Sequence, residues 1–285
     1  MYGYIDGIDF CELPAEKYWS FPKSFKGNKE KETKYMIKSG LYKGSLKKDG
    51  FYERLIKDED GNIILQGRSK STTGVYLNKI EWVPQCKEFF ESLPNGTCLL
   101  GELYFPNKKG SRNVTTILGC LKNKALERQE KGEKLFYYVF DVWAYNGKSY
   151  LETKFNNRIE RLNSIAENSY NYIQFAEYFE GELLWDKLNE YLANGEEGIV
   201  ITKADSIPSP GKRTSRKTLK VKQTETIDAF IDGTYKKAEK EYKGITPLEN
   251  YSYWIMIEQG KSLWKISLKS SLAASLGLQY QDILL

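Results

Sequence analysis

The sequence predicts an α+β protein in which antiparallel sheets are flanked by helices, with a smaller, partial β-barrel behind. Three observations support this class. Short strand-like segments dominate after the first forty residues, and they include an expected hairpin over Gly50–Leu65 with a turn at Asp60-Gly61-Asn62. Amphipathic helices are expected over Phe155–Ala166 and Leu183–Leu192. A new set of strands then begins after Thr226, which indicates a second, short unit of the chain.

The remaining elements follow from hydrophobic spacing along the chain. Residues 1–40 are polar and broken, with a Lys/Glu-rich sequence over Lys26–Lys34. Apolar residues recur at helical spacing over Trp82–Leu93. Further strands are expected over Thr97–Phe105, Phe136–Trp143, Gly198–Thr202, Leu219–Val221, Asp228–Tyr235, Tyr251–Glu258 and Leu263–Leu268. We place the domain boundary between residues 226 and 227.

Composition excludes several kinds of chemistry. The chain of 285 residues has no histidine, which removes a histidine general base and His-ligated zinc. Its four cysteines lack the spacing of a structural zinc site, and free thiols in a reducing compartment are expected. No apolar run approaches the ~18 residues of a membrane span, and no signal peptide is recognisable. We therefore expect a cytoplasmic protein of a bacterium or of a phage-infected cell, with no membrane partner.

One tetrapeptide carries the most chemical information. Lys47-Lys48-Asp49-Gly50 lies between a strand-like segment and the expected hairpin. Asp-Gly is a common turn dipeptide, so the tetrapeptide alone is also typical of an ordinary turn. A desolvated, neutral lysine is a good nucleophile, and neighbouring cations lower its pKa. Lys47 is therefore a candidate nucleophile only if other motifs support it.

Two isolated carboxylates lie in or beside apolar strands. Glu102 is the one charge in the run TCLLGELYF, where a carboxylate is costly unless it is paired or faces a cleft. Glu197 precedes Gly198 at the start of a strand, where the glycine allows close backbone approach and the carboxylate can bind a hard cation. Phe140 lies in an equally apolar strand and can stack on a purine or simply fill the core.

Two lysines alternate with apolar residues near the end of the larger unit. Lys220 and Lys222 share one face of an expected strand because side chains alternate with a period of two. Adjacent ammonium groups repel unless an anion lies between or beside them, and a polyphosphate is such an anion. The mild net charge of +5 is compatible with nucleic acid but does not establish it.

Taken in order, these segments resemble the covalent nucleotidyltransferases, the superfamily of ATP-dependent DNA ligases, RNA ligases and mRNA capping enzymes. The resemblance covers roughly Leu41–Phe230 and rests on KKDG, GEL, VFDVW, EGIVI and LKVK. It implies a nucleotidyltransferase (ATP-grasp-like) domain over residues 1–226 and a short or truncated OB-fold-like domain over residues 227–285. The small size resembles minimal ligases of viral or phage kind.

The resemblance also implies roles for individual residues. Lys47 would carry the adenylate, and Lys220 and Lys222 would contact the α-phosphate as further catalytic groups. Glu197 would bind the metal ion. The implied nucleotide-binding set is Leu46, Lys47, Arg54, Arg68, Glu102 (ribose), Phe140 (adenine), Glu197, Arg213, Lys220 and Lys222. Arg216 is the alternative to Arg213 for a phosphate contact.

The sequence departs from the family pattern in two places. Many DNA ligases have an arginine five positions after the nucleophile, whereas this chain has Tyr52 there and its nearest arginine is Arg54. The basic motif that ends the second domain of a DNA ligase is not recognisable. These departures predict inefficient self-adenylylation, or else a sequence that continues beyond residue 285.

The implied function is that of an ATP-dependent DNA ligase, with roles in DNA repair, replication and recombination. It would act as a monomer on nicked double-stranded DNA, with ATP and Mg²⁺ or Mn²⁺. The helix containing Arg158 and Arg161 and the loop PGKR favour DNA. An RNA ligase acting on RNA ends remains an alternative, as does a non-catalytic nucleic-acid-binding module in which the many tyrosines stack on bases.

Overall fold

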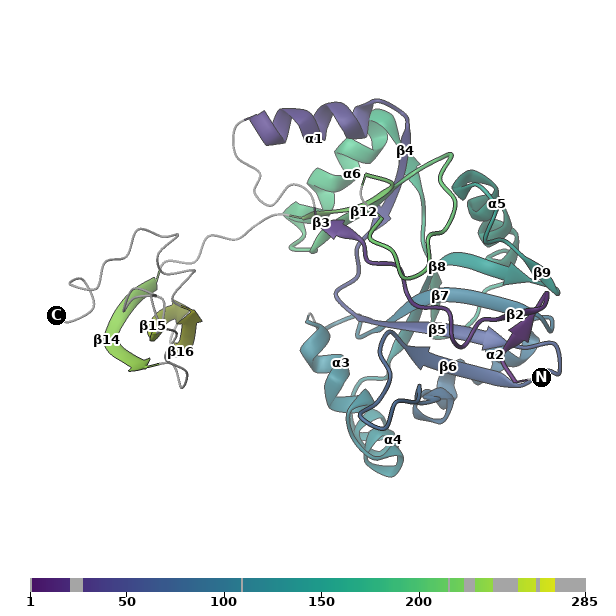
Figure 1. Ribbon diagram of the computed structural model, residues 1–285, viewed down its shortest axis with the longest axis horizontal. Helices are drawn as coiled ribbons and strands as arrows, with labels where there is room; N and C mark the ends of the chain where they lie inside the picture. Colours follow the sequence, from purple (N-terminus) through teal and green to yellow (C-terminus); the bar gives the residue numbers. More distant parts are fainter. Residues whose placement is uncertain are drawn as a thin grey trace, which may run out of the picture. The chain divides into compact units, whose positions relative to one another are not determined.

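The chain contains two compact units, Met1–Thr224 and Glu225–Leu285, which are described separately. Figure 1 shows the computed structural model of the chain. The larger unit contains two principal β-sheets, and the described strands of the smaller unit form one sheet. The structure describes residues 2–20, 28–108, 110–214, 216–222, 229–237, 251–259 and 262–269.

The first sheet of the larger unit has six strands. Their order is β10-β8-β7-β5-β6, with the short β9 paired to β8. Neighbouring strands are antiparallel except β10, which is parallel to β8. The strands are β5 (Phe51–Lys57), β6 (Ile63–Gly67), β7 (Thr97–Tyr104), β8 (Phe136–Tyr145), β9 (Lys148–Ser149) and β10 (Ile173–Phe175).

Both faces of this sheet are covered, which explains why its strands are so apolar. One face packs against α2 (Lys87–Ser92), α3 (Ser111–Leu118), α4 (Lys122–Lys131) and α5 (Phe155–Ile165). Two 3₁₀ turns precede α2, at Ile80–Trp82 (η1) and Pro84–Cys86 (η2). The N-terminal segment, which contains the small hairpin of β1 (Tyr4–Ile5) and β2 (Ile8–Asp9), covers part of the opposite face.

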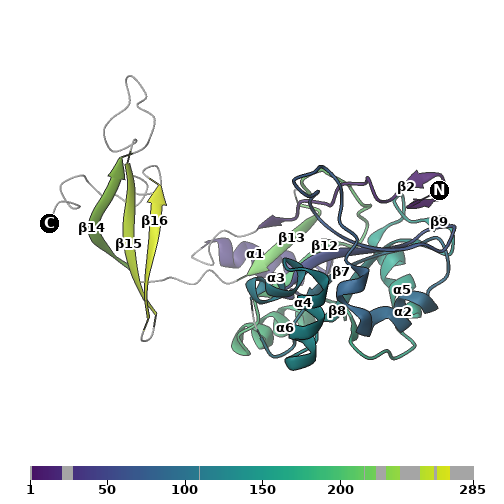
Figure 2. The ribbon, with the colours of Figure 1, turned by 90° about the horizontal axis from the view of Figure 1, so that it is seen from below.

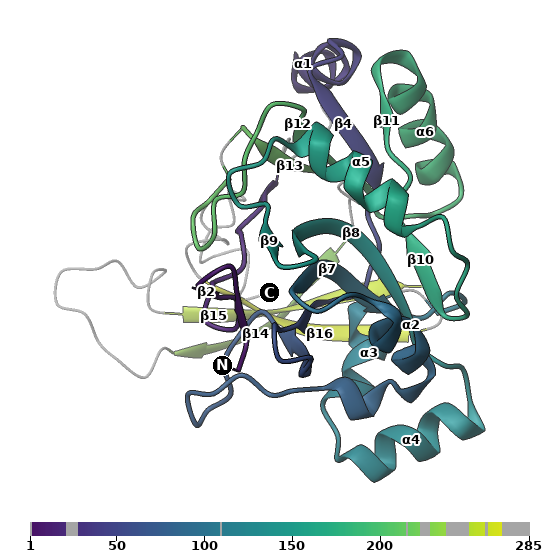
Figure 3. The ribbon, with the colours of Figure 1, turned by 90° about the vertical axis from the view of Figure 1, so that its right-hand side faces the viewer.

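The second sheet has five strands in the order β11-β4-β12-β13-β3. Its central strand β12 (Gly198–Lys203) is antiparallel to β4 (Tyr42–Leu46) on one side and to β13 (Thr218–Lys222) on the other. The edges are β11 (Phe179–Glu180) and β3 (Trp19–Ser20). Helices α1 (Asn28–Lys38) and α6 (Gly181–Ala193) cover its outer side, as Figure 3 shows from the end of the molecule.

Three helices were missed by the sequence patterns. The expectation of a polar, broken N-terminus is wrong for α1, where charged residues obscure a narrow buried face formed by Thr33 and Ile37. Helices α3 and α4 were also missed because each is short and its apolar face is made only by a few residues. In all three cases packing against a neighbour supplies the stability that the weak pattern does not indicate.

The expected strands and the two expected amphipathic helices are confirmed. The hairpin over Gly50–Leu65 is β5 and β6, and its turn contains Gly61 at φ 85°, a conformation that favours glycine. Asp58 stabilises this turn because its carboxylate accepts hydrogen bonds from the backbone N–H of Asn62 at 2.8 Å and of Gly3 at 2.9 Å. These bonds lower the pKa of Asp58 against the effect of its burial.

The smaller unit contains three expected strands. They are β14 (Ala229–Lys237), β15 (Tyr251–Gln259) and β16 (Ser262–Lys269), which form an antiparallel meander (Figure 2). Pairing of β14 with β15 shifts register between Ile231 and Tyr235. These described strands agree with the β-rich second unit expected from the sequence.

Glu53 is a buried acid, although no pattern in the sequence distinguishes it from the neighbouring residues. It lies on β5, its side chain is buried, and its Oε2 has no hydrogen-bond partner in the described part of the chain. Burial raises the pKa of this carboxyl to about 8, with a smaller opposing effect from Lys79. Glu53 is therefore neutral in the folded protein near pH 7.

Replacing Glu53 with glutamine is expected to change the pH dependence of stability. Between pH 4.5 and 8 the folded chain keeps a proton that the unfolded chain has released, so the stability of the native protein falls as pH rises through this window. Glu53→Gln removes this loss. Relative to wild type, we therefore expect the free energy of unfolding of the variant to increase between pH 4.5 and pH 8, by on the order of 1–3 kcal/mol. Urea unfolding across this range measures it, with the exposed Glu91→Gln as control. Parallel pH profiles for wild type and Glu53→Gln would contradict the assignment.

Candidate active site

A pocket lies between the two sheets of the larger unit. The five-stranded sheet contributes Ser45, Leu46, Val200, Thr202 and Lys220. The six-stranded sheet contributes Tyr52, Glu102, Tyr138 and Phe140. Lys47 and Lys48 line it from the turn that joins β4 to β5, together with Tyr18, Arg68 and Tyr178. The pocket thus combines residues from distant parts of the sequence, several of them ionisable.

The turn that carries Lys47 is shaped by close backbone contacts. Lys47 directly follows β4, and its backbone N–H donates to Gly198 O at 2.9 Å. A side chain at Gly50 would come within 2.5 Å of Leu103 O, and one at Gly198 within 2.2 Å of Val221 O. Both positions therefore require glycine. The close approach expected at Gly198 is confirmed, and it brings the Glu197 carboxylate beside Lys47.

Glu197 neutralises two lysines at once. Its Oε2 accepts a hydrogen bond from Lys47 Nζ at 2.5 Å, and its Oε1 lies 3.3 Å from Lys222 Nζ. Lys47 also donates to Lys48 O at 3.2 Å. The register of β12 with β13 explains this arrangement, because Gly198 is paired with Lys222 and Val200 with Lys220. The expected proximity of Lys47, Glu197 and Lys222 is therefore present in the fold.

Lys220 faces the pocket and is half-buried. Burial lowers its pKa, and the positive charges of Lys47 and Arg68 lower it further. Arg68 stacks over the Tyr52 ring at 5.0 Å and also lines the pocket. The pocket lining therefore contains Lys47, Lys48, Lys220 and Arg68 against one carboxylate, Glu102, while Glu197 contacts Lys47 beside it. Such an excess of positive charge suits an anionic ligand.

Glu102 is the carboxylate in the pocket lining. The residue is partly buried, and its buried Oε2 has no hydrogen-bond partner among the described residues. Burial raises the pKa of Glu102, whereas the positive charge of Lys47 lowers it. An unsatisfied buried oxygen that lines a pocket indicates a missing donor, since such groups otherwise cost on the order of 1–3 kcal/mol.

Aromatic and aliphatic side chains form the opposite end of the pocket. Phe140 on β8 lies 6.4 Å from Tyr52 between ring centroids, and its backbone O accepts a hydrogen bond from the Tyr178 hydroxyl. Val200 and Leu46 line the pocket from the other sheet. Phe140 thus lines the pocket and also packs against an aromatic cluster. Its role as a stacking surface for a purine stays a prediction.

Arg54 and Arg213 lie outside the pocket. Arg54 is buried on β5 and donates hydrogen bonds to Phe10 O and Leu13 O, which ties the N-terminal segment to the sheet. Arg213 is exposed in the loop before β13, where its backbone bridges to Lys17. Arg216, the alternative, is also exposed. Neither arginine of this loop lines the pocket, so their proposed phosphate contact stays a prediction.

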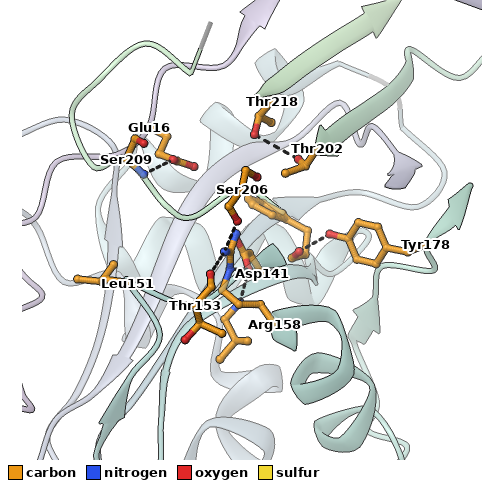
Figure 4. Close-up of polar contacts among 12 residues, drawn as sticks. Glu16, Asp141, Leu151, Thr153, Arg158, Tyr178, Thr202, Ser206, Ser209 and Thr218 are labelled. Carbon is orange, nitrogen blue, oxygen red and sulfur yellow. Dashed lines mark hydrogen bonds and ion pairs between the residues drawn. The ribbon is translucent and has the colours of Figure 1, made fainter. Parts of the chain in front are cut away.

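The structure gives Arg158 a different environment from the one that the sequence suggested. Its side chain is 3% exposed and forms a bidentate ion pair with Asp141, with N–O distances of 2.8 and 3.0 Å (Figure 4). It also donates to Thr153 O and Ser206 O. Arg158 therefore links α5 to β8 behind the pocket, and its presence no longer argues for a DNA-binding helix.

Tyr18 and its neighbour Glu16 were missed by the sequence patterns. Tyr18 lines the pocket from the N-terminal segment. Glu16 is buried, and it accepts a hydrogen bond from Ser209 N–H at 2.6 Å, which attaches this segment to the loop before β13. Burial raises the pKa of Glu16 to about 7. These residues lie in a polar region without periodicity, so only tertiary contacts reveal them.

A divalent cation would find few protein ligands here. Within the described residues there is no group of three or more His, Cys, Asp or Glu side chains arranged to bind a metal. One or two carboxylates with water and substrate phosphates are, however, the usual ligands of Mg²⁺. Glu197, with Glu102 nearby, fits this pattern of one or two carboxylate ligands. It does not fit a metal site in which the protein supplies all the ligands.

Comparison with known proteins assigns the family. The model of the ATP-dependent DNA ligase domain matches residues 26–222. This chain belongs to that family. The matched residues include Lys47, Glu102, Phe140, Glu197 and Lys220. Every residue that lines the pocket, except Tyr18, lies within the matched range.

Curated relatives match parts of the chain. DNA ligase 1 of Korarchaeum cryptofilum is 32% identical over 94 residues, which are 33% of this chain and 17% of the relative. A DNA ligase of Natronomonas pharaonis is 28% identical over 158 residues, or 54% of this chain and 28% of the relative. The matched segments thus span less than a third of either relative.

Solved structures show the same fold at low sequence identity. A mycobacterial DNA ligase D complexed with ATP and MES has a TM-score of 0.54 at 16% identity, covering 95% of this chain and 79% of that one. A Lig E DNA ligase has a TM-score of 0.56 at 16% identity, covering 92% and 87%. At this identity the likeness extends to the fold alone.

None of the described helices is long and apolar enough to span a membrane.

Breaking the Asp141–Arg158 pair is expected to destabilise the larger unit strongly. Arg158→Met leaves a buried carboxylate without its partner, and we expect a loss of about 3–5 kcal/mol in the free energy of unfolding. The double variant Asp141→Leu/Arg158→Met removes both charges and should recover much of that loss. Urea unfolding measures both variants. Equal destabilisation by the exposed Arg112→Met control would contradict a special role for the pair.

Proposed function

We propose that this chain is an ATP-dependent polynucleotide ligase, in the first instance a DNA ligase that seals 5′-phosphate/3′-hydroxyl nicks through a lysyl-AMP intermediate. The observation that carries the proposal is the position of Lys47. Its Nζ lies in a pocket that also contains Lys220, Glu102 and Phe140, and it contacts Glu197 at 2.5 Å. Family membership of residues 26–222 supports the same chemistry.

In the first step, Lys47 Nζ attacks the α-phosphorus of ATP. A P–N bond forms, the bond between the α-phosphorus and the bridging oxygen breaks, and pyrophosphate leaves. The attacking nitrogen gives up a proton to solvent in this step, so the product is a neutral phosphoramidate. Lys47 Nζ contacts Glu197 Oε2 at 2.5 Å, and this contact must be released for the nitrogen to reach the α-phosphorus.

The ionic groups of the pocket support the phosphate end of the nucleotide. Lys220, Lys222 and Arg68 offer positive charge to the phosphates, where charge accumulates in the transition state. Glu197 is the residue proposed to hold Mg²⁺ or Mn²⁺. When bound there, the cation would supply Lewis-acid stabilisation of the same charge. The lysines, in contrast, act directly as hydrogen-bond donors.

The remaining pocket residues support the nucleoside end. The free Oε2 of Glu102 is suited to accept a hydrogen bond from a ribose hydroxyl. Phe140 and Val200 provide apolar surfaces from the two sheets, between which an adenine ring fits. AMP then passes to a 5′-phosphate end, and a 3′-hydroxyl attacks that phosphate and expels AMP.

The proposal of DNA rather than RNA as the substrate rests on the match to the ATP-dependent DNA ligase domain. Arg158 no longer favours DNA, because it is buried against Asp141. An RNA ligase therefore remains the second candidate, with the same pocket chemistry. Nicked duplexes made of DNA, of RNA and of the two mixed separate these candidates. We further propose that the smaller unit is a partial OB-fold-like domain, since its described strands form an antiparallel meander.

The proposed activity predicts a covalent adduct. Intact mass after incubation with Mg²⁺ and ATP should increase by one AMP, but not with GTP or NAD⁺, and the gain should be absent in Lys47→Ala. Pyrophosphate pretreatment removes any adenylate acquired during expression. Lys43→Ala is the matched control, because Lys43 lies on β4, the strand that leads to Lys47, but pairs with Glu180 outside the pocket. No adduct on wild type, or an adduct on Lys47→Ala, would overturn the assignment.

Glu102→Gln is expected to slow adenylylation. The amide keeps the size of the side chain but loses the charge that strengthens a hydrogen bond from ribose, so kcat/KM for ATP should fall about 10–100-fold. Single-turnover formation of lysyl-AMP measures it, with Glu91→Gln as an exposed control. If 2′-deoxy-ATP and 3′-deoxy-ATP both react with wild type as well as ATP does, Glu102 has no contact with a ribose hydroxyl.

A further inference from the structure

The N-terminal strap, which we define as residues 10–20, is attached to both sheets of the larger unit. At its start, Arg54 on β5 of the six-stranded sheet donates hydrogen bonds to Phe10 O and Leu13 O. At its end, β3 pairs in parallel with β13 of the five-stranded sheet. The strap therefore joins the two walls of the pocket, and any side chain that it directs between them is held from both sides.

The middle of the strap is bound to the loop that leads to β13. The backbone N–H of Gly211 donates to Pro14 O at 3.1 Å, and that of Ser209 donates to the buried carboxylate of Glu16 at 2.6 Å (Figure 4). Tyr18 follows these contacts directly and precedes β3. Hydrogen bonds on either side of Tyr18 thus fix the backbone from which its ring enters the pocket lining.

Tyr18 carries a pocket hydroxyl that has no hydrogen-bond partner among the described residues. Two other hydroxyls in the lining are engaged within the protein. Tyr178 donates to Phe140 O, and Thr202 pairs with a threonine of β13 at 3.2 Å (Figure 4). The Tyr52 hydroxyl is also unpaired but is wholly buried, whereas Tyr18 keeps part of its surface accessible. The Tyr18 hydroxyl is therefore available to a ligand.

Strand register places Tyr18 away from the lysines that are proposed to contact phosphate. Trp19 is paired with Leu219, so Tyr18 lies beside Thr218. Thr218 is four residues before Lys222, which corresponds to about 13 Å along β13. The Tyr18 ring thus lines the end of the pocket that is proposed to hold the nucleoside, where the polar groups of a base lack partners so far.

The Tyr18 hydroxyl remains protonated near neutral pH. Burial raises the pKa of Tyr18 well above its usual value, and the negative charges of Glu16 and Asp141 raise it further. Both carboxylates have donors of their own, Ser209 for the first and Arg158 for the second. A neutral phenol can donate one hydrogen bond and accept another, so both capacities are free for a ligand.

We propose that the Tyr18 hydroxyl hydrogen-bonds to a nitrogen on the edge of the purine base and so contributes to recognition of the nucleotide. This inference rests on the proposed function, which supplies a nucleotide with its base against Phe140. It deepens that function by assigning base recognition to the N-terminal strap. Tyr18 lies outside residues 26–222, the range that matches the family model, so this contact belongs to the chain's own N-terminal segment.

The test removes one oxygen from the full-length chain and, separately, one group from the base. Tyr18→Phe keeps the ring and loses only the hydroxyl. Tyr35→Phe is the control, because Tyr35 is exposed on α1 outside this pocket. Calorimetry in a Lys47→Ala background measures binding without adduct formation. The nucleotides are ATP, 1-deaza-ATP, 3-deaza-ATP, 7-deaza-ATP and purine riboside triphosphate, which lacks the amino group of adenine.

We expect Tyr18→Phe to weaken ATP binding about 5–10-fold, the effect of one lost neutral hydrogen bond. One of the four analogues should bind about 5–10-fold more weakly than ATP when Tyr18 is present, and this difference should disappear in Tyr18→Phe. Tyr35→Phe should behave as its parent does. With Lys47 restored, the rate of lysyl-AMP formation at saturating ATP should change less than about twofold, because the contact is equal in the ground and transition states.

The outcomes separate the Tyr18 contact from the proposed function. Normal lysyl-AMP formation with equal ATP affinity for Tyr18→Phe and its parent overturns the contact alone and leaves the ring as a wall. If all four analogues bind as tightly as ATP when Tyr18 is present, the contact is also overturned, without any variant at this position. No lysyl-AMP on wild type, with an analogue penalty that depends on Tyr18, overturns the ligase function and leaves the base contact. A chain that binds no ATP overturns both.

Discussion

The register of β12 between β4 and β13 is the constraint on which the pocket depends. Pairing with β4 leaves Lys47 directly beyond the strand end, where its N–H bonds to Gly198 O. Pairing with β13 brings Lys220 and Lys222 to the same edge. A slip of one residue in either pairing would move these side chains to the opposite face. The glycine at position 198 makes this register possible, because any side chain there would collide with Val221 O.

Charge in the larger unit is divided between structural and exposed roles. Arg54 and Arg158 are buried, and each supports the walls of the pocket through carbonyl or carboxylate partners. The lysines at and beside the pocket remain partly accessible, and Glu197 contacts two of them, Lys47 and Lys222. This division follows from the chemistry of the two side chains. A guanidinium fork satisfies several fixed acceptors at once, whereas a compact ammonium suits exchange between partners.

The six-stranded sheet connects the pocket with the main core of the larger unit. One face of β7 carries Glu102 towards the pocket, while its other face packs against the helices of the main core. Asp49 joins the turn of Lys47 to the start of α3. The same sheet that buries the core thus positions one wall of the pocket.

The sequence by itself determined the longer strands and two of the amphipathic helices, because period-two and helical patterns are local signals. The resemblance of its ordered motifs to a known family pointed to Lys47, Glu102, Phe140 and Lys220, which line the pocket, and to Glu197 beside it. Only the tertiary structure decided that Arg54 and Arg158 are internal supports, and that Tyr18 reaches the pocket. It also decided that α1, α3 and α4 are helices. Those outcomes depend on partners distant in sequence, such as Phe10 for Arg54 and Asp141 for Arg158, and no local pattern encodes such contacts.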